Sequence, residues 1–218
     1  MMYRACRNRL NAVLLATKGV AMIEFALGLP LLLGLSLSGL EMGNYIIANN
    51  RVQRLASMAA DLIAQSGQGR IGLNEGQIYD LFNALDVTAK PFNLREHGRI
   101  VITAVRGVDK SGSGKTTNEI LWQRFDGAFA QAQPVLGCWQ DSKTADLNKV
   151  LPKNELLFHV QVTYDYQPLF SSIPFSMLDL PQHFTRTAMY RARKNDLTLP
   201  DQQDQFPPKQ NCDSADGL

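Results

Sequence analysis

The chain has 218 residues, which is enough for one domain of ordinary size and marginal for two. The net charge of +2 is uneven, because residues 1–19 contain Arg4, Arg7, Arg9 and Lys18 and no acid. Without those four positive charges the remainder has a charge of −2. A body with that charge gives no reason to expect nucleic-acid binding.

An apolar run follows the basic segment and occupies residues 20–40, with Glu24 as its one charged residue. As a helix, this run would span roughly 31 Å, close to the ~30 Å hydrocarbon core of a bilayer. We therefore predict a transmembrane helix over 20–40, and Pro30 is tolerated within such a helix. The basic segment should stay cytoplasmic by the positive-inside rule, so everything after Glu41 is expected outside the cytoplasm.

Two alternatives to this interpretation concern the start of the run. A secretory signal peptide usually has a shorter apolar region, of roughly 7–15 residues, and ends in a small-residue cleavage site. A soluble secreted protein also has no use for an acid such as Glu24 at that place. An acid there is costly to insert and is a functional candidate, although an interfacial acid without a partner is the other interpretation.

The segment from Lys18 to Pro30, Lys-Gly-Val-Ala-Met-Ile-Glu-Phe-Ala-Leu-Gly-Leu-Pro, resembles the TadE/TadF-like family of minor pseudopilins of tight-adherence (Flp, type IVb) pilus systems. The shared pattern is a basic leader, a glycine, an acid five positions later followed by an aromatic, and an apolar run with an early proline. A slight departure is Ile23, where the family usually has a small residue or valine.

The resemblance implies that a prepilin peptidase cuts between Gly19 and Val20 and removes residues 1–19 as a leader. It also implies that Glu24 and Phe25 act in assembly with other pilins and the pilus machinery. The protein would be a single-pass protein of the bacterial inner membrane, with a periplasmic C-terminal domain. No cofactor, metal, nucleotide or nucleic acid is expected.

The helix is predicted to continue beyond the membrane over residues 41–65, because apolar residues recur there at helical spacing. This stripe consists of Ala48, Val52, Leu55, Ala59, Leu62 and Ile63. A second helix is predicted near Asn74–Leu85, where Asn74 and Gln77 stand at the spacing of a capping box. Its apolar face holds Ile78, Leu81, Phe82 and Leu85.

Four strands are predicted after these helices, because β-branched and aromatic residues dominate four short stretches. They are Arg99–Arg106, Ile120–Phe125, Leu156–Tyr166 and Phe184–Arg193, and the first two should form a hairpin with a long loop. In the third strand, polar residues alternate with apolar ones, and His159 on the polar face is expected to be a surface residue rather than a catalytic base. The fold class predicted is α+β, with an antiparallel sheet of about four strands in a domain over residues 66–195.

The C-terminal part of the chain carries two further features. The segments Tyr164–Phe170 and Arg186–Arg191 also resemble the family, and residues 196–218 are predicted to be a flexible polar tail. Cys138 and Cys212 would lie outside the cytoplasm, where a disulfide between them is possible. Their spacing alone leaves two unpaired thiols open as an alternative.

The loop Ser111–Thr117 imitates a phosphate-binding loop, with Gly114 followed by Lys115 and Thr116. A true phosphate loop needs a glycine where this chain has Asp109, and it must open a helix, whereas a strand is predicted here. We therefore expect a flexible hairpin loop and no catalytic residues. The leading hypothesis is a minor pilin or pseudopilin. The alternatives are an unprocessed single-pass membrane protein with an extracytoplasmic binding domain and, third, a nucleotide hydrolase.

Overall fold

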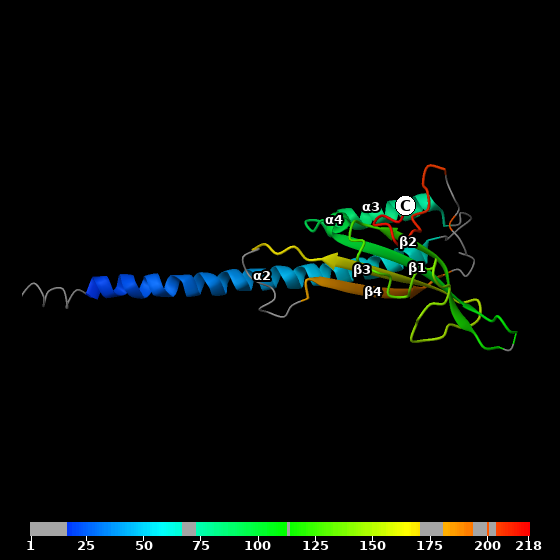
Figure 1. The fold of residues 1–218 in the computed structure, drawn as a ribbon, viewed down its shortest axis with the longest axis horizontal. Coiled ribbons are helices and arrows are strands. Elements are labelled where there is room, and N and C mark those ends of the chain that lie inside the picture. Colours follow the sequence, from blue (N-terminus) through cyan, green and yellow to red (C-terminus); the bar gives the residue numbers. More distant parts are fainter. Residues whose placement is uncertain (1–16, 67–72, 113, 171–180, 194–199, 201–203) are drawn as a thin grey trace, which may run out of the picture. The chain divides into compact units, whose positions relative to one another are not determined.

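The computed structural model describes residues 17–66, 73–112, 114–170, 181–193, 200 and 204–218. Most of the predicted leader, residues 1–16, therefore lies outside the described residues. The helices described are α2 (Thr17–Gln65), α3 (Glu75–Ala89) and α4 (Leu94–His97). The strands are β1 (Gly98–Val108), β2 (Thr117–Asp126), β3 (Leu156–Asp165) and β4 (His183–Arg191), as Figure 1 shows. The predicted α+β class, with its long N-terminal helix and four-stranded sheet, is confirmed.

The chain divides into two compact units, which we describe separately. Among the described residues, the first unit contains 17–44 and 168–170, and the second contains the rest. The long helix α2 belongs to both, because the division falls between Asn44 and Tyr45. The part of α2 after Asn44 is thus a component of the second unit, which we call the body.

The body half of α2 is one-sided, as its helical spacing predicts. Five of the six residues of the predicted stripe are buried, and Leu62, which is 44% exposed, is the exception. Ala56, Ala60 and Ala64 are buried instead and extend the buried face on the side away from Leu62. At 100° per residue this places Leu62 at the edge of the buried face, so its inclusion in the stripe was wrong.

Helix α3 begins with the predicted capping box. The Asn74 side chain accepts a hydrogen bond from the Gln77 backbone N–H at 2.9 Å, and the Gln77 side chain accepts one from the Asn74 N–H at 3.3 Å. These bonds satisfy two of the backbone donors that a helix start leaves unpaired. The predicted apolar face of α3 is buried throughout.

The sheet is antiparallel, with strand order β2-β1-β3-β4. Strands β1 and β2 form the predicted hairpin, with Ile102 opposite Arg124, and their register shifts once, between Ala104 and Val105. Strand β1 pairs on its other side with β3, which in turn pairs with β4. The central strands are therefore β1 and β3, and this position explains why both are rich in buried residues.

One face of the sheet forms the main core with the helices. Apolar side chains from β1, β3, α2 and α3 belong to a single buried cluster, in which Ile102, Phe158 and Val160 are completely buried. Many of the α2 residues in this cluster are alanines, whose short side chains let the helix backbone approach the sheet closely.

The opposite face of the sheet is covered by irregular chain, so the expectation that His159 lies at the surface was wrong. His159, Gln161 and Thr163 are 3%, 2% and 4% exposed. The segment over 127–155 folds across them, and Gln161 donates to the Gln133 carbonyl and accepts from the Val135 N–H. A strand with alternating polarity thus has both faces buried, because the covering loop supplies polar partners.

Part of the segment expected to be a flexible tail is packed against the body. Phe206 contacts the ring of Tyr79 with centroids 5.2 Å apart, and the Lys209 carbonyl accepts a hydrogen bond from the Phe125 N–H at 2.8 Å. Lys209 also forms an ion pair with the buried Asp126. Residues 204–218 therefore carry specific contacts that their polar composition did not reveal.

Candidate functional site

The residues predicted for processing and assembly lie at the start of α2. Gly19, Val20, Glu24 and Phe25 are all helical and exposed, and a Cβ at Gly19 would meet nothing within 4 Å. The helix continues without a break through Pro30. The described part of the chain therefore leaves the space beside Gly19 open.

Glu24 stands four residues after Val20, one turn along the same helix face. Its neighbours Ile23 and Phe25 are 62% and 65% exposed. Within the described residues, no hydrogen bond or ion pair engages the Glu24 carboxylate. The structure thus presents a carboxylate in an exposed apolar surface.

The exposed surface around these residues is apolar over a long distance. Every residue from Gly19 to Leu40 is exposed, and the helix is long and apolar enough to cross a membrane. In Figure 1, this stretch is the blue part of α2. A helix that is apolar on all sides, and that no other described part of the chain covers here, has the length and composition to cross the hydrocarbon layer of a membrane.

Glu41, directly after this stretch, is a residue that sequence reasoning did not single out. It is only 2% exposed, and its carboxylate accepts hydrogen bonds from the backbone N–H groups of Leu169 and Phe170 at 3.3 and 3.1 Å. An acid that ends an apolar run was visible in the sequence. Its partners lie 128 and 129 positions away, so no local pattern could have indicated them.

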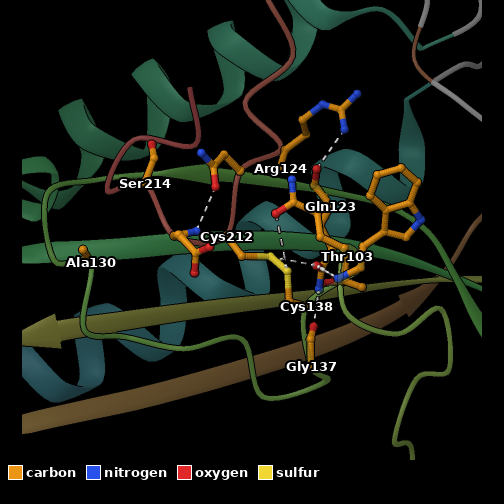
Figure 2. Close-up of a disulfide and its surroundings, with 12 residues drawn as sticks. Thr103, Gln123, Arg124, Ala130, Gly137, Cys138, Cys212 and Ser214 are labelled. Carbon is orange, nitrogen blue, oxygen red and sulfur yellow. Dashed lines mark hydrogen bonds between the residues drawn. A yellow bond between two sulfur atoms is a disulfide. The ribbon is translucent and has the colours of Figure 1, made fainter.

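The two cysteines left open by the sequence form a disulfide in the body. Cys138 and Cys212 have Cα atoms 6.1 Å apart and are 74 positions apart in the chain. Figure 2 shows the bridge beside Gln123 and Thr103. Gln123 donates to the Gly137 carbonyl and accepts from the Trp139 N–H, both at 2.8 Å, which fixes the loop that carries Cys138.

A buried arginine reinforces the same junction. Arg99, on β1, donates to the backbone carbonyls of Ala130 and Ala132 in the covering loop and to those of Cys212 and Ser214 in the C-terminal segment. Its guanidinium also lies 4.8 Å from the Phe125 ring centroid. Burial lowers the pKa of Arg99 from its usual value. The bridge and this arginine together tie the C-terminal segment to the sheet.

The phosphate-loop imitation has its own internal partners. The Gly114 N–H donates to the Asp109 carboxylate at 3.1 Å, so the loop places its own acid where a phosphate would bind. Lys153 lies 3.7 Å from the same carboxylate. The segment after the loop is β2 and not a helix, as the sequence predicted.

His159 lies on the covered face of the sheet, beside a cavity of about 370 Å³. Burial lowers the pKa of its imidazole to about 4, so the ring is neutral at ordinary pH. The cavity is lined by residues of the covering loop and of strands β3 and β4, including Leu136, Leu157 and Met189. Among the described residues, no group of three His, Cys, Asp or Glu side chains is placed to hold a metal ion.

The structure therefore brings together the four helical residues but leaves the cysteine pair in a different unit. The helical residues belong to an anchor of the kind found in single-pass membrane proteins, since α2 supplies one N-terminal apolar helix. Compared with known protein families, residues 19–61 match the TadE-like protein family. No curated protein and no solved structure matches the chain.

This match confirms the resemblance predicted from the segment Lys18–Pro30, and it begins at Gly19 itself. It fits a protein associated with tight-adherence pili that carries one membrane helix. The resemblance of Tyr164–Phe170 and Arg186–Arg191 to the same family lies outside the matched residues and stays a prediction.

Proposed function

We propose that this chain is a minor pilin or pseudopilin that acts in the assembly of a tight-adherence type IVb pilus. The observation that carries the proposal is the spacing of Gly19 and Glu24 at the start of an exposed apolar helix within the TadE-like match. The protein works by assembly and catalyses no reaction. The inner membrane, a prepilin peptidase and other pilins are its proposed partners.

The proposed orientation places the N-terminus in the cytoplasm and the body in the periplasm. The basic residues before Gly19 support it through the positive-inside rule. The Cys138–Cys212 bridge supports it independently, because disulfides persist in oxidising compartments such as the periplasm.

Cleavage after Gly19 is the first step of the proposed function. A glycine lets a peptidase approach the backbone closely, and the structure leaves the space around Gly19 open. Gly19→Phe should leave the full-length form in cells that contain the peptidase, whereas the wild-type chain should begin at Val20. The intact mass of the purified protein measures this. A wild-type protein that keeps residues 1–19 would favour the unprocessed single-pass protein with a binding domain.

Glu24 gives the assembly step its physical basis. Cleavage creates a positive amine on Val20, and a carboxylate and an amine in an apolar medium attract strongly, whereas each is costly if left unpaired. Glu24 can pair with the amine of its own chain, roughly 6 Å away in helical rise, or with that of a neighbouring subunit. The second arrangement sets the register between subunits while it neutralises both charges.

The variant Glu24→Gln tests this pairing, because it keeps the side-chain size and removes the charge. We expect normal insertion and near-normal cleavage, with loss of pilus assembly or of co-purification with partner pilins. Glu96→Gln is the matched control, since Glu96 is an exposed acid on α4 of the body. If Glu24→Gln assembles as well as this control, Glu24 is only an interfacial acid.

The proposal that the chain is not an enzyme also has a direct test. Lys115→Ala should leave pilus assembly unchanged, because Asp109 occupies the position that a bound phosphate would need. If the purified wild-type protein binds a nucleotide and Lys115→Ala does not, the nucleotide hydrolase is favoured instead.

A further inference from the structure

The contact between Glu41 and the segment Pro168–Phe170 lies at the end of the apolar stretch of α2, within one compact unit. Glu41 is 2% exposed and holds the N–H groups of two consecutive residues, Leu169 and Phe170. The contact therefore fixes the backbone of a segment distant in sequence against α2, at a defined position along the helix axis.

The position of this segment along the axis of α2 follows from the direction in which helix side chains point. Side chains tilt toward the N-terminus of their helix and cover the turn before their own Cα. The Glu41 carboxylate, and the backbone bound to it, therefore lie level with the last turn before Glu41. Leu40 in that turn is 62% exposed, and Met42 on the other side of Glu41 is 38% exposed.

The bound segment presents apolar surface at this position along the helix axis. Leu169 is 62% exposed, while Pro168 and Phe170 are half-buried. An apolar side chain that stands beside the end of a membrane-spanning stretch continues the same lipid-facing surface. Exposure of this apolar surface to water is unfavourable, whereas the interfacial layer of a bilayer can bury it.

The hydrogen bonds to Glu41 have a physical reason in the same setting. Backbone N–H groups that face lipid must find an internal partner, and an acid near the hydrocarbon boundary is costly unless it is hydrogen-bonded. Bonds from N–H groups to a carboxylate are charge-assisted and stronger than neutral ones. The pairing of Glu41 with Leu169 and Phe170 satisfies both requirements at once.

We propose that Pro168–Phe170 is a second membrane contact, in which Leu169 rests in the interfacial layer of the leaflet on the body side. Glu41 is the positioning residue that holds the segment there. The inference rests on the proposed membrane-spanning role of residues 20–40 and adds a lipid-binding surface to it. This surface gives the chain a second point of contact with the same bilayer, beside the end of the apolar stretch of α2.

Site-directed spin labelling of the full chain in vesicles of phosphatidylcholine and phosphatidylglycerol tests this contact. The label is placed at Leu169→Cys in a Cys6→Ser background, which leaves the Cys138–Cys212 bridge intact. Val87→Cys on α3 is the matched control, because Val87 is 63% exposed against 62% for Leu169. Leu33→Cys in the apolar stretch is the reference for lipid.

Collisions of each label with oxygen, which concentrates in lipid, are compared with collisions with a water-soluble nickel chelate. We expect a ratio of oxygen to nickel collisions several-fold higher at position 169 than at position 87. Adding Glu41→Ala should lower the ratio at position 169 and leave it unchanged at position 33. A ratio at position 169 that does not respond to Glu41→Ala contradicts the positioning role.

Equal ratios at positions 169 and 87, with lipid-like values at position 33, overturn the second contact and leave the membrane span standing. Water-like values at position 33 overturn the span and the second contact together. The reference label thus separates a failure of this inference from a failure of the proposed function.

Discussion

Helix α2 contains two regions that share one backbone and differ in surroundings. Between Val20 and Leu40 its large apolar side chains are exposed on all sides, as in Leu27, which is 74% exposed. Between Tyr45 and Ala64 one face is buried in the core of the body, and Ala48, Ala56, Ala59 and Ala60 are completely inaccessible.

This difference shows how the residue composition of each part of a helix matches its surroundings. Bulky leucines around the whole circumference suit lipid, which has no preferred face, whereas alanines on one face let a sheet approach closely. Mutations in the body half should therefore change the unfolding free energy of the body, and mutations in the exposed half should not. The following predictions concern the full chain in detergent, with tryptophan fluorescence as the measure of unfolding, because Trp122 is buried and Trp139 partly buried in the body.

The largest effect on the unfolding free energy is expected from the disulfide, which lies within the body. The bridge closes a long loop, since its cysteines are 74 positions apart. Removing it with Cys138→Ser and Cys212→Ser should lower the unfolding free energy by about 4 kcal/mol, because the unfolded chain regains entropy. Urea denaturation measures the loss, and Cys6→Ser is the control that should cost nothing. Labelling of two free thiols at positions 138 and 212 in unreduced, denatured wild type would contradict the bridge.

The most direct test compares the same substitution in each half of α2. Leu55 is 2% exposed in the core, and Leu33 is 48% exposed in the apolar stretch. Leu55→Ala should destabilise the body by about 3 kcal/mol, because it removes buried surface and leaves a cavity. Leu33→Ala should leave the urea midpoint of the body unchanged. Similar losses in both variants would show that the exposed stretch also packs against the body.

The stability of the body should depend on pH because of His159. Its folded pKa of about 4 lies below its unfolded value, so the stability that it contributes is complete above about pH 6.5 and is lost as the pH falls toward 4. Between about pH 7 and about pH 5 this loss amounts to about 2 kcal/mol. His159→Gln should flatten this part of the urea-midpoint profile. An unchanged slope in the variant would assign the dependence to other groups.

The smallest effect is expected at the start of α3. Asn74→Ala removes the side-chain half of the capping box and should cost about 1 kcal/mol. Asn50→Ala is the matched control, because Asn50 is an exposed asparagine inside α2 and caps no helix. Equal urea midpoints for the two variants would mean that the cap contributes nothing to stability.

The sequence alone determined the features that depend on neighbours along the chain. The extent of α2, the capping box at Asn74 and the four strands follow from apolar spacing and residue type within short windows. The segment around Glu24 likewise carried its resemblance within thirteen consecutive residues, Lys18–Pro30. Each of these features is local, so a local pattern is sufficient to predict it.

Only the tertiary structure decided the features that join distant parts of the chain. His159 is buried because the covering loop folds over β3, and residues 204–218 pack because Arg99 and the Cys138–Cys212 bridge hold them. Glu41 gained its partners from a segment more than a hundred positions away. The energies of such contacts depend on which surfaces meet, and no pattern within one stretch of sequence contains that information.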